Sequence, residues 1–201
     1  MNRRRFLALL FVALTGTASI STCQTLYFPA KIFSDDAQLD KFVRNWYGEQ
    51  LSALKEPSLL ALANDHTAQS YRFLWLRSFH HPVAVRLDVK ADGSATLTTK
   101  KTSGAGGYKP GRLTLSTSTG LTKLQTDAFL KKVDAVRFWD LPSVPKEPNS
   151  PDGAEWIIEG VKNGQYHLAE RQSPTDGAIF DLGRILAIHL ARLKIPKREM
   201  Y

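Results

Sequence analysis

The chain of 201 residues has a single cysteine, no run of 18 or more apolar residues and no Gly-x-Ser-x-Gly sequence. One cysteine cannot form an intramolecular disulfide, so the chain is not a disulfide-stabilised miniprotein. Without a long apolar run it cannot be a polytopic membrane protein. The missing pentapeptide removes the nucleophile motif of α/β-hydrolases, although a Ser-His-Asp triad needs no fixed motif. The remaining composition, 43% hydrophobic and 23% charged, predicts one globular domain.

The first residues have the three parts of a secretory signal. Arginines at positions 3–5 precede nine apolar residues at 6–14, and small residues follow as far as Thr22. The apolar run would span about 14 Å as a helix, against roughly 30 Å of membrane hydrocarbon, so it is too short for a transmembrane anchor. We therefore interpret residues 1–22 as a signal peptide. Residues 3–7 also resemble the twin-arginine export motif, so that route and general secretion both stay open.

Cys23 follows this signal and has no partner for a disulfide. Ile20-Ser21-Thr22-Cys23 resembles the lipobox of bacterial lipoproteins, with Thr22 where Gly, Ala or Ser is usual. The resemblance implies that Cys23 becomes the first mature residue and carries the lipid. It also implies a cell-envelope location facing the periplasm of a Gram-negative bacterium. A soluble periplasmic product, cut after Ala18 or Ser21, is the alternative.

The charge pattern does not predict a nucleic-acid partner. Removal of residues 1–22 takes away three arginines and no acidic residue, which lowers the formal charge from +8 to +5. The other cations form short groups, such as residues 100–101 and 131–132, rather than a basic stripe, and no nucleic-acid-binding motif accompanies them. The predicted partner is the membrane, reached through the lipid anchor. The sequence identifies no protein or small-molecule partner.

The mature chain is predicted to contain a membrane-proximal segment, residues 23–33, and one domain, residues 34–201. The apolar content of the segment predicts that it packs on the domain or rests against lipid. Gln24, where Asp would indicate the inner membrane, favours the outer membrane by resemblance to lipoprotein sorting. Ser34 is expected to cap a helix. The apolar residues of this helix predict one core stripe: Leu39, Phe42, Val43, Trp46, Leu51 and Leu54.

From Tyr71 onward the hydrophobic period changes to two, which is typical of strands. Strands are expected at residues 71–78, 83–90, from 94, 112–117, 154–161 and 165–171, and further helices at 58–63, 122–136 and 178–193. The sequence therefore predicts an α+β domain, a mainly antiparallel sheet of about six strands with helices packed on one face.

Two hairpin registers follow from turn chemistry. A three-residue loop at 91–93 would pair Leu87 with Leu97 and keep the apolar residues on one face. Asn163-Gly164 predicts a two-residue turn that sets His167 opposite Gly160.

No group of residues has the spacing of a metal or cofactor site, so none is predicted. The histidines, at positions 66, 80, 81, 167 and 189, include no i, i+4 pair. The glycine-rich residues 104–111 do not fit a phosphate-binding loop, because Tyr108 precedes Lys109 and Pro110 follows it. We expect residues 104–111 to form a flexible connection between two strands.

The carboxylates of the last hairpin are candidates for acid-base chemistry. Glu155 and Glu159 would share a face about 13 Å apart, which is wider than the roughly 5–9.5 Å of glycosidase pairs. We therefore expect these residues and Glu170 to be solvated charges paired with Arg171 or Lys162. The tryptophans at 75, 139 and 156 would be either core or the lining of a ligand groove beside Arg77 or Arg171.

Two local patterns, Phe138-Trp139-Asp140-Leu141-Pro142 and Asp152-Gly153-Ala154-Glu155-Trp156, resemble small exported bacterial envelope domains. The resemblance covers about half of the chain and implies an envelope protein without an assigned activity. The sequence therefore predicts a non-enzymatic envelope lipoprotein that serves as a binding or interaction module. A soluble periplasmic ligand-binding or immunity-type protein is the second hypothesis, and an exported hydrolase the third.

Overall fold

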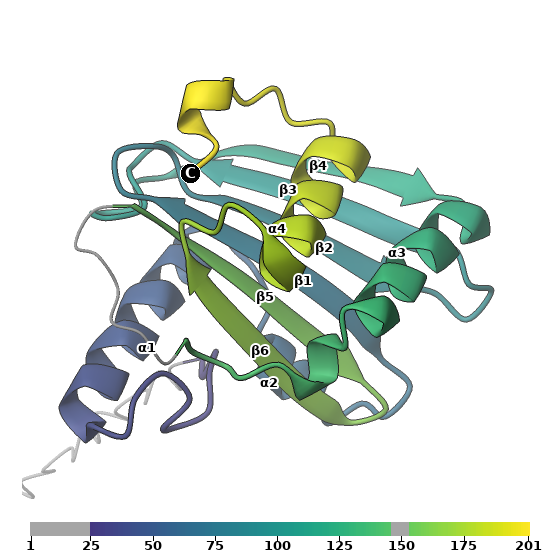
Figure 1. Cartoon of the computed structure of the whole chain (residues 1–201), viewed down its shortest axis with the longest axis horizontal. Coiled ribbons are helices and arrows are strands. Elements are labelled where there is room, and N and C mark those ends of the chain that lie inside the picture. Colours follow the sequence, from purple (N-terminus) through teal and green to yellow (C-terminus); the bar gives the residue numbers. More distant parts are fainter. Residues whose placement is uncertain (1–24, 146–152) are drawn as a thin grey trace, which may run out of the picture.

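The computed structural model describes residues 25–145 and 153–201. The predicted signal peptide, Cys23 and part of the proline-rich loop lie outside these residues. Six strands form one antiparallel sheet in the order β4-β3-β2-β1-β5-β6 (Figure 1). Their bounds are β1 Gln69–Arg77, β2 Val83–Val89, β3 Ala95–Thr102, β4 Leu113–Leu121, β5 Ala154–Lys162 and β6 Gln165–Gln172. The predicted α+β architecture with a six-stranded antiparallel sheet is confirmed.

Both predicted hairpin registers are confirmed. Leu87 lies opposite Leu97 because the loop before β3 places Gly93 at a φ of 81°, in the left-handed region that glycine favours. His167 lies opposite Gly160, and the turn at Asn163-Gly164 has φ values of 54° and 76°. Positive φ at both central residues defines the type I′ turn that matches the twist of a tight hairpin.

Helices α1 Ala37–Ala53, α2 Leu59–Leu62, α3 Lys123–Ala135 and α4 Gly177–Arg184 occupy the predicted regions. Thr122 caps α3 in a capping box with Gln125. The expected cap of α1 is wrong: Asp36, not Ser34, accepts the hydrogen bonds from the first helical amides. Asp36 is two residues closer to the first apolar turn, so its carboxylate reaches those amides. The last helix continues from α4 into a π-helix, Ile185–Leu190.

Helices cover both faces of the sheet, so the expectation that they pack on one face is wrong (Figure 1). On one face Phe129 of α3 and Leu182 of α4 pack over Phe73 of β1. On the other face Leu51 and other residues of α1 pack over Leu74, in the same strand. The physical reason is that β1 and β5 are buried along nearly their whole length, and each apolar face needs its own cover.

Residues 25–33 contribute two side chains to the core that α1 covers. Phe28 and Phe33 are buried and their rings meet edge to face, 5.3 Å apart between centroids. Two hydrogen bonds tie the preceding residues to the domain: Ser58 donates to the carbonyl of Leu26, and the hydroxyl of Tyr27 donates to the carbonyl of Glu56. The chain is therefore fixed to the domain from Leu26 onward, three residues after position 23.

Candidate functional site

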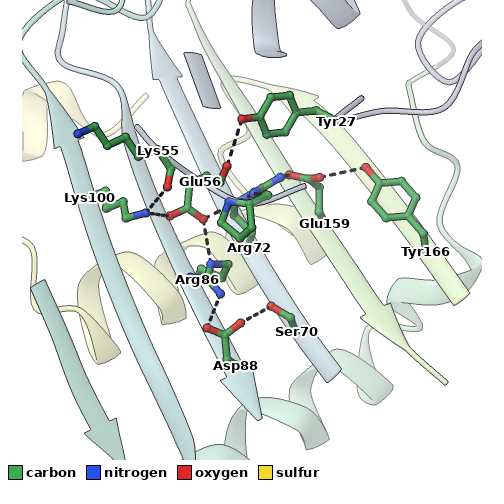
Figure 2. A network of polar contacts seen from close by, with 11 residues as sticks. Tyr27, Lys55, Glu56, Ser70, Arg72, Arg86, Asp88, Lys100, Glu159 and Tyr166 are labelled. Atoms are coloured by element: carbon green, nitrogen blue, oxygen red, sulfur yellow. Dashed lines mark hydrogen bonds and ion pairs between the residues drawn. The ribbon is translucent and has the colours of Figure 1, made fainter. Parts of the chain in front are cut away.

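The α1 face of the sheet contains a buried network of charges centred on Arg72 (Figure 2). Arg72 is fully buried and contacts the carboxylates of Glu159 at 2.6 Å and Glu56 at 3.5 Å. Arg86 and Lys100 also contact Glu56, each at 2.9 Å.

This Arg72 network is balanced in charge. Arg86 pairs a second time, with Asp88, so three cations meet three carboxylates. Tyr166 and Pro57 supply further hydrogen bonds to Glu159 and Arg72. Because its charges are compensated inside the protein, the network serves to join strands and the α1–α2 connection, and leaves no charge for a ligand.

A second acidic group on the same face is not balanced. Glu155 of β5 and Glu170 of β6 are 8% and 4% exposed, and the pairing of the two strands makes them diagonal neighbours. The hydroxyl of Tyr47 donates to Glu170 at 3.1 Å, and Gln172 donates to Oε1 of Glu155 at 3.2 Å. Oε2 of Glu155 is buried. Among the described residues its one possible donor is the carboxyl group of Glu170, when that group is protonated.

Burial and the neighbouring carboxylate shift the titration of this pair. Burial, and then the charge of Glu155, raise the pKa of Glu170 to about 8, although Tyr47 and Arg171 act in the opposite direction. Burial also raises the pKa of Glu155. Like charges this close cannot both ionise in a poorly solvated place, so at neutral pH the pair keeps one shared proton. The pair therefore carries about one negative charge, and none of the ion pairs among residues 25–145 and 153–201 neutralises it.

Glu155 lines a pocket of about 170 Å³, between α1, the ends of β1 and β6, and the loop between β3 and β4. The other lining residues are Trp46, Leu76, Ser78, Gly107, Tyr108, Gly153 and Gln172. A water molecule occupies about 30 Å³ in the liquid, so the pocket has room for a group of several heavy atoms.

The glycine-rich loop forms one wall of this pocket and is anchored on both sides. Gly106 donates to the carbonyls of Arg77 and His80, while its own carbonyl accepts from the indole of Trp46 at 3.1 Å. A Cβ at this glycine would lie 2.7 Å from the backbone of Leu76, so only glycine allows such a close approach. The loop connects two strands as predicted, but these bonds hold it in place, so it is not the flexible connection that we expected.

Four large exposed apolar side chains lie on the three segments that also supply the pocket residues Trp46, Ser78 and Tyr108. Leu39 and Phe42 lie on α1, seven and four residues before Trp46, and are 52% and 66% exposed. Phe79 and Tyr108 are 65% and 64% exposed, with ring centroids 6.2 Å apart. We call Leu39, Phe42, Phe79 and Tyr108 the apolar rim. The prediction that Leu39 and Phe42 belong to the core stripe is wrong, whereas Leu51 and Leu54 of the same stripe are buried as predicted. The reason is that the buried side of the helix also includes Tyr47, and this rotation leaves Leu39 and Phe42 in solvent.

The three candidate carboxylates are buried, so the expectation of solvated charges paired with Arg171 or Lys162 is wrong. Glu159 pairs with Arg72 and Glu155 neighbours Glu170. The physical reason is that α1 covers the face of the hairpin on which all three side chains lie.

The five histidines do not converge on one place. His80 bonds to the hydroxyl of Tyr201 at 2.8 Å, and His81 bonds to the carbonyl of Gly104 at 2.8 Å. His167 packs against Phe138, where burial lowers its pKa. His66 neighbours the turn at Gly164, and His189 is exposed. Among residues 25–145 and 153–201, no group of three acidic, histidine or cysteine side chains could hold a metal ion.

The tryptophans are mainly core residues. Trp75 and Trp156 are buried beneath α4, and both indole N–H groups donate to the carbonyl oxygen of Tyr201, at 3.2 and 2.9 Å. Arg77 stacks on Trp75 at 4.6 Å and binds Glu199. The alternative prediction was a ligand groove beside Arg77. In the structure the chain's own residues 199–201 occupy this place. Trp139 is half-buried beside His167.

A larger trough of about 1100 Å³ runs between residues 25–28 and α1. Its charged lining residues are at the surface, and two of them, Arg44 and Glu49, pair with Asp40 and Lys109. Among the described residues no buried charged residue lines this trough, whereas the buried Glu155 lines the smaller pocket, so the Glu155 pocket is the better candidate site.

Comparison of the chain with models of protein families found no matching family. A search of curated proteins found no similar sequence. Cys23, the predicted lipidation site, lies outside the residues that the structure describes.

Proposed function

We propose that this protein is a cell-envelope lipoprotein, anchored through Cys23, whose domain is a non-enzymatic binding module. The observation that supports a binding role is that the apolar rim lies on the same three segments as the residues Trp46, Ser78 and Tyr108 of the Glu155 pocket. Isolated exposed apolar residues are ordinary on protein surfaces, whereas several large ones on the segments that form a pocket are typical of an interaction site.

The beginning of the described chain is compatible with a short tether. Cys23 is three residues before Leu26, whose carbonyl is fixed by Ser58, so the connection spans at most about 11 Å. A lipid on Cys23 would hold the domain next to the bilayer, facing the periplasm, with the outer membrane favoured. Within the described residues, no helix is both long enough and apolar enough to cross a membrane.

The proposal can be tested by site-specific photo-crosslinking in cells that produce the protein. A photoreactive phenylalanine derivative replaces Phe42 in the rim or, as the matched control, Leu124 of α3. Leu124 is 79% exposed and lies on α3, which covers the opposite face of the sheet. We expect a discrete adduct from position 42 that is absent from position 124 and weakened by Glu155→Gln. Equal labelling at the two positions, or no adduct at position 42, would argue against a binding site here.

One observation favours the exported hydrolase, which was the third hypothesis from the sequence. A carboxyl group whose pKa is raised next to an ionised carboxylate is typical of general acids, and Glu170 beside Glu155 has this property. Turnover of generic esterase, phosphatase, peptidase or glycosidase substrates, abolished by Glu170→Gln, would support the hydrolase over the binding module. A soluble periplasmic binding protein differs from the main proposal only in lacking the lipid.

A further inference from the structure

A short segment of the chain, residues 197–201, lies in a groove at the end of β1 and the start of β5 (Figure 1). The indole N–H groups of Trp75 and Trp156 both donate to the carbonyl oxygen of Tyr201. The partly buried side chains of Met200 and Tyr201 pack against the core of this face. The groove therefore already binds a peptide, the 197–201 segment of the chain itself.

Charged groups add to these contacts. Nη1 of Arg77 lies 3.3 Å from Oε2 of Glu199, and Nε2 of His80 lies 3.6 Å from the same oxygen. Nδ1 of His80 is also 2.8 Å from the hydroxyl of Tyr201. Arg77 is 3% exposed, and among the described residues Glu199 supplies the one carboxylate that pairs with it. A buried guanidinium without a carboxylate is costly, so any occupant of the groove must supply one.

The 197–201 segment is held by side chains rather than by the backbone. Within the described residues, its backbone N–H groups donate to residues 196 and 197, and none of them joins it to the sheet. Both contacts between Arg77 and Glu199 are 3.3 Å, at the long end for such bonds. Residues 191–196, which lead to the segment, contain no helix or strand. The segment can therefore leave without breaking any strand pairing, and the groups that it covers then become accessible to a ligand.

These contacts select a peptide rather than a small anion. A free carboxylate or phosphate would meet Arg77 and His80 but would leave the apolar positions of Met200 and Tyr201 empty. The two indole donors converge on one backbone carbonyl, two residues after the glutamate. A ligand that satisfies every contact has a carboxylate side chain followed, two residues later, by a tyrosine.

We propose that this groove is a peptide-binding site, and that the 197–201 segment is an internal latch that a partner protein displaces. The displacing segment of the partner has the chemistry of the latch, a glutamate followed two residues later by a tyrosine. The groove lies on the α4 face of the sheet and the Glu155 pocket on the α1 face, so this inference does not depend on the role of that pocket. The closed latch lowers the apparent affinity for the partner, because only molecules with an open groove bind.

The test is fluorescence anisotropy on the full chain in detergent micelles at pH 7. The probe is the peptide Lys-Arg-Glu-Met-Tyr, which has the sequence of the latch, with fluorescein on its amino group. The variant with Glu199→Gln and Tyr201→Ala opens the latch, and we expect it to bind the probe at least tenfold more tightly than the wild type does. A probe with glutamine in place of glutamate should bind this open variant at least tenfold more weakly, because Arg77 then meets no carboxylate.

Matched variants separate the groove from the rest of the segment. Lys197 and Arg198 are exposed and lie in the same segment, so Lys197→Ala with Arg198→Ala should bind the probe as weakly as the wild type. Adding His80→Ala to the open variant should weaken the probe about three- to tenfold, since the contacts with glutamate and tyrosine are lost. Thermal denaturation of each variant establishes that it is folded.

Hydrogen exchange provides a second measurement, which needs no substitution. Opening of the latch exposes the indole N–H groups of Trp75 and Trp156 without unfolding the sheet. In the wild type, nuclear magnetic resonance should therefore show that these groups exchange with deuterium by local opening, well before the backbone amide of Phe73 in the middle of β1.

Several results would overturn the inference. Equal binding of the probe to the wild type and the open variant would show that the segment is not a latch. Equal binding of the glutamine probe would exclude recognition of the carboxylate, and no binding to a folded open variant would exclude a peptide site. Indole exchange that occurs only with global unfolding would contradict displacement of the latch. A wild-type dimer that is lost in the open variant would assign the groove to a second copy of the chain instead of a different partner.

Discussion

Tyr47 of α1 and Glu170 of β6 are joined by a hydrogen bond of 3.1 Å between the phenol hydroxyl and the carboxyl oxygen Oε1. Both side chains are buried, and the bond ties the helix directly to the sheet. It also favours the ionised form of Glu170, against the larger effect of burial. The relationship links the stability of the fold to the protonation of the candidate site.

Tyr47→Phe should therefore have two effects. Loss of the donor leaves a buried carboxyl oxygen with fewer hydrogen bonds, which should lower the free energy of unfolding by about 1–2 kcal/mol. The same loss should raise the pKa of Glu170 further. Urea denaturation of the wild type and the variant measures the first effect, and the pH dependence of the unfolding free energy measures the second. An unchanged unfolding free energy would show that the bond contributes nothing.

Stability should fall as the pH rises from 6.5 to 8. The folded protein keeps the proton of Glu170, whose pKa is about 8, whereas an unfolded glutamic acid has lost its proton above pH 4.5. The folded state thus binds more protons, and the free energy of unfolding decreases with rising pH by at most about 1.4 kcal/mol per unit. Below pH 6.5 His167 acts in the opposite direction, because its lowered pKa makes stability rise with pH there.

Glu170→Gln is the control for this pH dependence. Glutamine cannot titrate, so the slope between pH 6.5 and 8 should become much shallower, and stability at pH 8 should rise relative to the wild type. Guanidinium denaturation at pH 6.5, 7, 7.5 and 8 provides the measurement. If the two proteins show parallel curves, Glu170 is already ionised in the folded state at pH 6.5.

Arg72 should be essential for folding but not for binding. Arg72→Met leaves Glu159 buried without its cation and should lower the free energy of unfolding by about 3–5 kcal/mol. The double variant Arg72→Met with Glu159→Met removes both charges and should be less destabilised than the single variant. Urea denaturation compares them. If the double variant loses as much unfolding free energy as the two single variants lose together, Arg72 and Glu159 do not stabilise each other.

The turn at Gly164 offers a test of the hairpin that contains the site. Gly164→Val should destabilise the protein by about 1–3 kcal/mol, since the native φ of 76° is strained for a β-branched residue. A new Cβ would also lie 2.4 Å from His66, whose ring would have to move. Gly120→Ala in β4, where a Cβ meets nothing within 4 Å, is the control and should change stability little. Equal thermal stability of the two variants would argue against the turn conformation.

The sequence contained most of the information about the sheet. The turns at Gly93 and Asn163-Gly164, with the alternation of apolar residues around them, are local features, and local features determine hairpin register. The second covered face also had a signal in the sequence. Leu74 and Leu76 alternate with Phe73 and Trp75 in β1, and a strand that is apolar on both faces is typical of a sheet with cover on each side.

The candidate site was only partly predictable. The predicted hairpin register already places Glu170 opposite Ile157, on the same face as Glu155, so their proximity could have been inferred. Their burial could not, because it depends on α1 and on the loop around Gly106, which are distant in sequence. A local pattern in α1 or in the loop does not show which part of the sheet the segment will cover. Similarly, the exposure of Phe42 depends on how α1 is rotated against the sheet.

The central claim, a lipid-anchored envelope protein, is tested most directly by mass spectrometry of the mature N-terminus after membrane fractionation. We predict a membrane-bound product that begins at Cys23 and carries acyl chains, and we predict that Cys23→Ser releases the protein or leaves it unprocessed. Several acyl chains give stable attachment, whereas one gives only reversible binding. A soluble periplasmic product that begins at residue 19 or 22, with a free thiol at Cys23, would contradict the account.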